Sequence, residues 1–247
     1  MAIFGFQLPN GAIGAIRAPL VVLFAVLLLL PALHADFTMN SLQVSIYLNP
    51  DGSASVQELM DIAITGNDSI QIYDDTRSTY SDISTWKDRL GLSELRQHIT
   101  VAEANVYNLT LTPGPVQECN LFTGVCSATF ELNYRVAAPK NSTGLLLLDM
   151  YKPRTTLYSL NPQALSFEQT KSGDILLPAG TTISITIPQD AENIYFSALP
   201  YSLTNGAETD TNTSDFRYDQ STDLNYYVGS DRTFSWKGDV LPNFQFT

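Results

Sequence analysis

Apolar and polar residues alternate with a period of two along much of the chain after residue 41, a pattern typical of half-buried β-strands. The first two runs cover residues 42–48 and 56–64. Between them, the sequence NPDG at residues 49–52 provides proline with its preset φ and glycine for a positive φ. These residues therefore predict a β-hairpin.

The same period returns at residues 99–111 and 128–136. Shorter segments rich in β-branched, aromatic and aliphatic residues follow, at residues 144–151, 155–160, 181–188, 193–198, 225–228, 232–236 and 242–247. Many short strands with turn residues between them are typical of antiparallel β-sandwiches. We therefore predict a mainly β fold, built as one large or two small Ig-like antiparallel β-sandwiches.

One segment, residues 81–97, departs from the strand pattern. Ile83, Trp86 and Leu90 recur there at helical spacing, directly after Asp82, a residue type that caps helix N-termini. We predict one short helix, or two helical turns, inserted into the β structure.

Two β-rich domains are expected after residue 35, one over residues 36–140 with the helical insertion and one over residues 141–247. The boundary is placed near residues 139–143, because that stretch is polar and turn-forming. The same stretch also suits a loop inside a single domain. The sequence contains no internal repeat that would separate the two arrangements.

The N-terminal segment, residues 1–35, has the layout of a signal peptide or an N-terminal anchor. An apolar run over residues 20–30 follows Arg17, and no acidic residue occurs in this segment. The run is shorter than the about 20 apolar residues that cross a bilayer, which favours a signal peptide. Cleavage is expected after Ala35. The alternative is an uncleaved anchor, because Leu33 at the minus-three position is bulkier than the small residues usual there.

The chain is acidic, with a net charge of −12 at pH 7, and all 25 acidic residues lie beyond residue 35. A surface this acidic repels phosphate backbones, so we exclude nucleic acid as a partner. An extracellular or cell-surface location is expected. The expected partners are other envelope proteins or glycans, the membrane through an uncleaved N-terminal segment, and further copies of the chain.

Sequons of the form N-x-[ST] agree with export and are candidate glycosylation sites. They begin at Asn67, Asn108, Asn141 and Asn212. Asn108 lies in the alternating segment VYNLTLT, where Tyr107 and Leu109 occupy the other set of positions. If this segment is a strand, Asn108 points away from the Tyr/Leu face and toward solvent.

The chain has two cysteines, Cys119 and Cys126, with strand patterns on both sides of them. In an oxidising compartment this spacing predicts a disulfide that closes a hairpin loop and stabilises the fold by about 2–3 kcal/mol. A zinc site needs about four ligands, and His98 is the only histidine beyond residue 35. We therefore do not expect the cysteines to bind metal.

No catalytic motif surrounds His98, since the sequence lacks a G-x-S-x-G elbow, an H-E-x-x-H pair and a glycine-rich phosphate loop. We interpret His98 as a capping or surface residue. Carboxylates such as Asp74 and Asp75 are abundant, but no pattern brings two of them to the separation that a glycosidase needs. The protein is therefore predicted to be non-enzymatic and without a cofactor, with carboxylate-based hydrolysis as the alternative chemistry.

Calcium is the one metal with a candidate site. Residues 205–224 are rich in acidic side chains and are predicted to form a long exposed loop. Hard oxygen ligands occur there at close spacing, on Asp210, Asn212, Ser214 and Asp215. The segment lacks the glycine of a calcium-binding loop at the required place, so a solvated loop without an ion is the alternative.

Four segments resemble uncharacterised archaeal exported and cell-surface proteins with a β-rich ectodomain. They are YLNPDGSASVQE at 47–58, YKPRTTLYSLNP at 151–162, LPAGTTISITIP at 177–188 and FSWKGDVLPNFQF at 234–246. The resemblance implies export and a β-rich ectodomain, and it carries over no catalytic residue. Such proteins commonly have an anchoring helix after the last strand. This chain ends at Thr247 in a strand pattern, so we expect anchoring through residues 1–35, or release.

Three functions agree with these features. The leading hypothesis is a non-enzymatic secreted or membrane-anchored protein with a structural or interaction role in the cell envelope. The second is a carbohydrate- or calcium-dependent binding module. The third is a subunit of a surface filament, in which residues 242–247 add a strand to the sheet of a neighbouring copy. The alternative for this segment is that it pairs with a strand of its own domain.

The export hypothesis predicts the mass of the protein recovered from its native envelope. We expect a chain that begins at Asp36 and whose two thiols react with an alkylating reagent only after reduction. A disulfide-bonded chain that retains residues 1–35 would instead indicate an N-terminal anchor. Free thiols on an unprocessed chain would contradict export.

Overall fold

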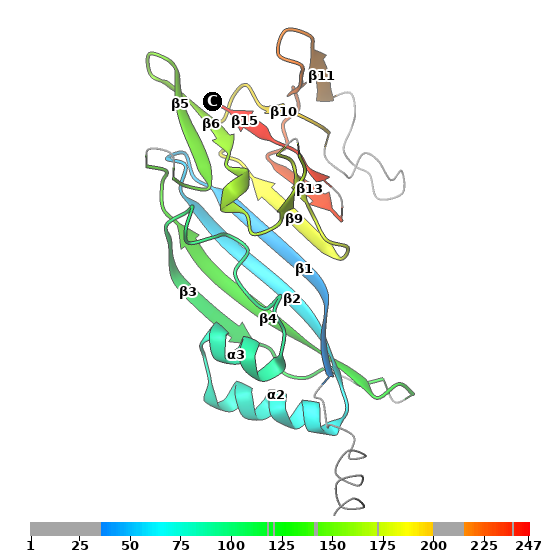
Figure 1. Ribbon diagram of the computed structural model, residues 1–247. Coiled ribbons are helices and arrows are strands. Elements are labelled where there is room, and N and C mark those ends of the chain that lie inside the picture. Colours follow the sequence, from blue (N-terminus) through cyan, green and yellow to red (C-terminus); the bar gives the residue numbers. More distant parts are fainter. Residues whose placement is uncertain are drawn as a thin grey trace, which may run out of the picture. The chain divides into compact units, whose positions relative to one another are not determined.

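The predicted hairpin is the centre of the larger of two six-stranded sheets. Strand β1 (Asp36–Leu48) pairs antiparallel with β2 (Ala54–Thr65) from end to end, as Figure 1 shows. In the connecting turn, Gly52 has a φ of 80°, and a Cβ atom there would lie 2.8 Å from side-chain atoms of Pro139 and of Tyr158. Only glycine fits this turn, because both the dihedral angle and the space exclude a side chain.

The computed structural model describes residues 36–117, 119–120, 122–140, 143–171, 173–199, 215–238 and 240–247. The predicted signal peptide or anchor, residues 1–35, lies outside the described residues, as do the sequons at Asn141 and Asn212. Within the described part, no helix is both long and apolar enough to cross a membrane.

The first sheet has the strand order β13-β9-β1-β2-β4-β3. The strands not yet given are β3 (Val106–Pro113), β4 (Val125–Val136), β9 (Thr181–Thr186) and β13 (Thr233–Lys237). All neighbours are antiparallel except β1 and β9, which run parallel. Because β9 and β13 follow residue 140 and the others precede it, residues 36–140 and 141–247 both contribute strands to this sheet.

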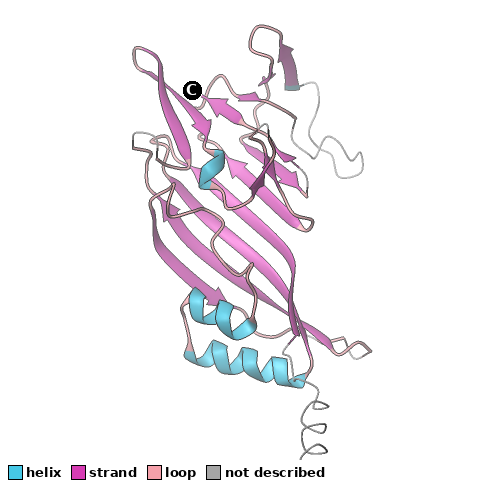
Figure 2. Ribbon diagram, in the orientation of Figure 1, coloured by secondary structure: helices cyan, strands magenta, loops and turns pink. Residues whose placement is uncertain are grey.

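The second sheet has the order β11-β12-β10-β15-β6-β5, and a small third sheet has the order β14-β8-β7. The second consists of β5 (Leu146–Lys152), β6 (Thr155–Leu160), β10 (Tyr195–Phe196), β11 (Phe216–Asp219), β12 (Leu224–Tyr227) and β15 (Phe244–Phe246). The third consists of β7 (Glu168–Gln169), β8 (Ile175–Leu176) and β14 (Val240–Leu241). The predicted mainly β, antiparallel fold is confirmed (Figure 2).

The loop prediction for residues 205–224 needs correction, and the open strand edge of the filament hypothesis is not found. The segment 205–224 is not a continuous loop, because β11 lies within it and Phe216 packs 5.8 Å from Phe196 and 5.0 Å from Tyr227 between ring centroids. The strand at residues 242–247 is not an open edge, because β15 pairs with β10 on one side and β6 on the other. Its backbone groups are therefore already used within its own sheet.

Two helices precede β3 where one short insertion was predicted. Helix α3 (Ile83–Leu90) begins after Asp82, whose carboxylate accepts the Thr85 N–H at 2.8 Å, and ends at Gly91, which has a φ of 65°. Helix α2 (Asn67–Thr79) was not predicted. It forms because Tyr73 packs on Trp86 with ring centroids 5.2 Å apart, a contact that exists only once both helices cover the sheet. A single 3₁₀ turn, η1 (Pro162–Ala164), follows β6.

Aromatic side chains fill the two ends of the core. At one end, Phe130 of β4 meets Tyr73 of α2 and Trp86 of α3 edge to face, with centroid separations of 5.7 and 4.9 Å. Figure 1 shows these two helices at the lower end of the long strands. At the other end, Phe196 of the second sheet lies 4.8 Å from Phe234 of the first. This second cluster joins the two sheets.

Replacing Phe130 by alanine should lower the free energy of unfolding by about 3–5 kcal/mol, because the ring is fully buried and the cavity left behind cannot close. The matched control is Phe122→Ala, since Phe122 is 100% exposed in the loop of the disulfide. Its effect should stay within about 0.5 kcal/mol. Equilibrium denaturation of the disulfide-bonded protein measures both values, and equal effects would contradict this assignment of the core.

Candidate functional site

A carboxylate lies in the middle of the apolar face of the first sheet. Glu58 stands on β2 between Val56 and Met60, in the row of residues that points into the core, and is 0% exposed. Its neighbours across the strands are Val44 and Leu132. An unpaired charge at such a position would cost several kcal/mol, so its partners decide whether the sheet is stable.

Three donors surround Glu58. The backbone N–H of His98 donates to Oε1 at 2.8 Å, the His98 ring lies with Nδ1 2.8 Å from Oε2, and the Tyr134 hydroxyl donates to Oε1. Burial, and then the negative charge of Glu58, raise the pKa of Tyr134 far above its ordinary range, so the phenol keeps its proton. Hydrogen bonds to both oxygens replace the water that burial removes from this carboxylate.

Backbone pairing holds His98 in place. Its carbonyl accepts the Ser166 N–H at 2.8 Å, and the Thr100 N–H donates to the Ala164 carbonyl at 2.8 Å. Leu95 and Ile99 on either side are fully buried. The segment after α3 is therefore clamped against residues 164–166, and the imidazole is held over Glu58.

The interpretation of His98 as a capping or surface residue is wrong, because the residue is only 4% exposed and its ring is paired with Glu58. A signal for the site was present in the sequence, namely a glutamate at an inward position of a strand that is otherwise apolar. The signal does not reveal the partner, because His98 lies 40 residues away and Tyr134 lies 76 residues away.

A pocket of about 760 Å³ opens at this histidine, and we call it the His98 pocket. Its lining includes two glutamates and one arginine as well as apolar side chains. The lining residues are Leu42, Glu94, Arg96, His98, residues 166–168, residues 176–178 and Thr181. The Phe167 ring is stacked on the imidazole, with centroids 5.2 Å apart and an interplanar angle of 15°. Arg96 donates from Nη2 to the Ser166 carbonyl at 3.2 Å. The pocket therefore combines a flat aromatic surface with hydrogen-bonding groups.

Metal ligation has no support among the described residues, since no group of three or more His, Cys, Asp or Glu side chains there is placed to hold an ion. Three of the calcium candidates, Asp210, Asn212 and Ser214, lie outside the described residues. The fourth, Asp215, is described and accepts the Val228 N–H through its backbone carbonyl at 2.7 Å.

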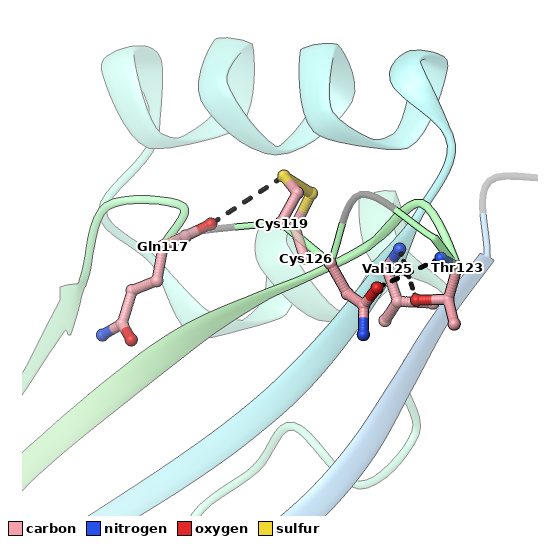
Figure 3. Close-up of a disulfide and its surroundings, with 6 residues drawn as sticks. Gln117, Cys119, Thr123, Val125 and Cys126 are labelled. Atoms are coloured by element: carbon pink, nitrogen blue, oxygen red, sulfur yellow. Dashed lines mark hydrogen bonds between the residues drawn. A yellow bond between two sulfur atoms is a disulfide. The ribbon is translucent and has the colours of Figure 1, made fainter.

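The predicted disulfide between Cys119 and Cys126 is present (Figure 3). Cys126 belongs to β4 and is paired with Ile64 of β2. Between the cysteines, the side chain of Asn120 accepts the N–H groups of Phe122 and Thr123 at 2.9 and 3.3 Å. The bridge thus closes a loop at one end of β4 and contributes no side chain to the His98 pocket.

The described sequons lie on the surface. Asn67 is the exposed first residue of α2. Asn108 is also exposed, but it has a φ of 56° at a register shift between β3 and β4, and Tyr107 and Leu109 beside it are 42% and 39% exposed. The regular alternation expected for this segment is therefore interrupted at Asn108. Glycosylation at either asparagine stays a prediction.

Comparison with known proteins does not name a function. No protein-family model matches the chain, and no curated protein matches it. The resemblance to archaeal exported proteins therefore stays a prediction. Any assignment of function has to rest on the geometry of the site.

Replacing Tyr134 by phenylalanine should lower the free energy of unfolding by about 1–3 kcal/mol, because the buried carboxylate loses one of its donors. The matched control is Tyr47→Phe, since Tyr47 is 50% exposed on the outer face of β1, and its effect should stay within about 0.5 kcal/mol. Denaturant titration at neutral pH measures both.

The pH dependence gives a second measurement on the same variant. The pKa of Tyr134 is raised in the folded protein, so its contribution is complete below the pKa of about 10 of an unfolded tyrosine and is lost as the pH rises above it. The loss of stability above about pH 10 should be smaller in Tyr134→Phe than in the wild type. Identical alkaline profiles would contradict the burial of this phenol.

Proposed function

We propose that this protein is a non-enzymatic interaction protein of the cell envelope, exported from the cell, and that it binds its partner in the His98 pocket. The observation that carries the proposal is a pocket of about 760 Å³ whose lining includes a buried histidine paired with a buried carboxylate. Concave, partly apolar pockets with a few fixed polar groups are the usual form of ligand sites.

Export is supported by two features. A disulfide persists in oxidising compartments and is rare in the cytosol. The acidic composition also suits a protein kept soluble outside the cell. Both features agree with the signal-like segment at residues 1–35.

Binding rather than catalysis is supported by the surroundings of His98. A nucleophilic site needs a hydroxyl or thiol within hydrogen-bond reach of the imidazole. In the described part of the chain, the only side chain that bonds to the ring is Glu58. Ser166 contacts His98 through its backbone N–H, which bonds to the His98 carbonyl.

A carbohydrate-binding module is the second candidate, and it is favoured by the presence of Phe167 beside polar walls. The calcium-dependent form has its candidate ligands mostly outside the described residues. A filament assembled by donation of residues 242–247 needs a strand with an unpaired edge. Strand β15 does not provide one, because it is paired with β10 and with β6. A filament built through another surface stays a separate hypothesis.

Binding of the full chain to isolated host envelopes tests the proposal. We expect saturable binding that weakens roughly tenfold or more in Phe167→Ala, because the wall of the pocket is lost. The control is Arg135→Ala, an exposed residue on the outer face of β4, which should bind like the wild type. Equal binding of all three proteins, or none by the wild type, would refute the pocket as the interaction site.

The non-enzymatic part of the proposal is tested in the same incubation. Envelope glycans and proteins should keep their masses after prolonged contact with the protein. Release of fragments by the wild type, abolished by Glu58→Gln, would show hydrolysis and overturn this part.

A further inference from the structure

One nitrogen of the His98 ring has no hydrogen-bond partner among the described residues. The His98 ring bonds to Glu58 through Nδ1, and no described residue bonds to Nε2. The buried side-chain nitrogens and oxygens that lack a partner in the described part of the chain are Arg232 Nε and Trp236 Nε1. Because Nε2 is not one of these, it keeps contact with solvent, and the ring meets solvent in the pocket that it lines.

The partners of Glu58 decide the proton state of this nitrogen. Both carboxylate oxygens are engaged, Oε1 by the His98 N–H and the Tyr134 hydroxyl and Oε2 by the ring. In the tautomer that pairs with a carboxylate, Nδ1 carries the proton and donates to Oε2. Nε2 of that neutral tautomer is an acceptor, on a ring that lines the pocket.

The charged groups near the pocket exclude an anionic ligand. Glu94 and Glu168 line the pocket and Glu58 bonds to the ring, whereas Arg96 is the one cation among the described lining residues. The whole chain also carries a net charge of −12. An anion would be repelled at close range and by the overall field.

The hydrogen-bonding groups of the walls match hydroxyl groups. His98 Nε2 and the carboxylates of Glu94 and Glu168 accept, whereas Arg96 donates. A hydroxyl both donates and accepts, so a polyhydroxy ligand can bond to the acceptors and to the donor that line the pocket. The carbon face of a sugar ring suits an aromatic side chain such as Phe167.

We propose that the His98 pocket binds a neutral saccharide, with one sugar hydroxyl donating its hydrogen bond to His98 Nε2. Glu58 is a positioning residue, since it keeps the proton on Nδ1 and Nε2 free to accept. This inference rests on the proposed function, and it specifies the ligand class and the contact atom of the same pocket.

An array of immobilised neutral hexose oligosaccharides, sialylated and sulfated oligosaccharides and lysine-rich peptides tests the ligand class with the full chain. Neutral saccharides should be bound and the anionic ones rejected. Binding confined to anionic saccharides or to peptides would overturn the proposal. Calorimetry with a bound oligosaccharide then provides the affinity for the variants.

His98→Asn separates the contact atom from the fold. Asparagine retains an amide N–H near the position of Nδ1, able to donate to Glu58, and has no atom at the position of Nε2. We expect a folded protein, judged by its near-ultraviolet circular dichroism, that binds the saccharide roughly tenfold more weakly or worse. Unchanged affinity in the folded variant would overturn the role of Nε2.

Glu58→Gln tests the positioning role by NMR. A glutamine amide can donate to Nδ1, which moves the ring proton to Nε2 and turns the acceptor into a donor. In a His34→Gln background, His98 is the only imidazole, and its ¹⁵N spectrum should show protonated Nδ1 in the parent protein and protonated Nε2 in Glu58→Gln. The control is Glu131→Gln, a glutamate on the opposite face of the same sheet that accepts from Gln57 at 2.8 Å, and it should leave the spectrum unchanged. An unchanged His98 spectrum in Glu58→Gln would overturn the positioning role.

The outcomes separate this inference from the proposed function. If Phe167→Ala weakens binding to envelopes while His98→Asn binds like the wild type, the pocket stands as the interaction site and the saccharide contact fails. If neither substitution changes binding to envelopes, both fail. Loss of binding in both supports both.

Discussion

The buried carboxylate of Glu58 is the constraint on which the centre of the structure depends. A charge inside a hydrophobic face is tolerated only when donors replace the water it has lost. Here those donors come from Tyr134 on β4 and from the backbone and ring of His98 in the segment after α3. The hydrogen bonds to this carboxylate therefore connect β2 with its neighbour β4 and with the segment after α3.

The same constraint explains why a pocket lies there. The segment that brings His98 to Glu58 is itself clamped to residues 164–166 by backbone hydrogen bonds. Phe167, directly after that clamp, then stacks on the imidazole. The His98 pocket thus contains an aromatic ring, a histidine and charged side chains. The contacts that stabilise the core around Glu58 also hold His98 and Phe167 in place there. A site fixed in this way loses little conformational entropy when it binds a ligand.

The rest of the fold is organised around the long β1–β2 hairpin. Helices α2 and α3 contact each other through Tyr73 and Trp86 and cover one end of the sheet. Strand β9, from the later part of the chain, pairs in parallel with the edge of β1. Aromatic contacts such as Phe196 with Phe234 join the second sheet to the first. The outer face of the first sheet stays polar, as in the hydrogen bond between Gln57 and Glu131. One face of the sheet thus carries the core and the pocket, and the other meets water.

Local patterns in the sequence determined the β character, the hairpin turn at residues 49–52, the helix that begins after Asp82 and the pairing of Cys119 with Cys126. Each depends on residues close together in the chain, where period, capping chemistry and spacing act directly. Tertiary structure alone decided α2, the parallel partner of β1, the strand within residues 205–224 and the burial of His98. These depend on contacts between residues far apart, such as Tyr73 with Trp86 and Glu58 with His98. A single sequence marks Glu58 as an ionisable residue in an apolar row. It does not show which distant groups donate hydrogen bonds to Glu58, because those groups come close to it only in the folded chain.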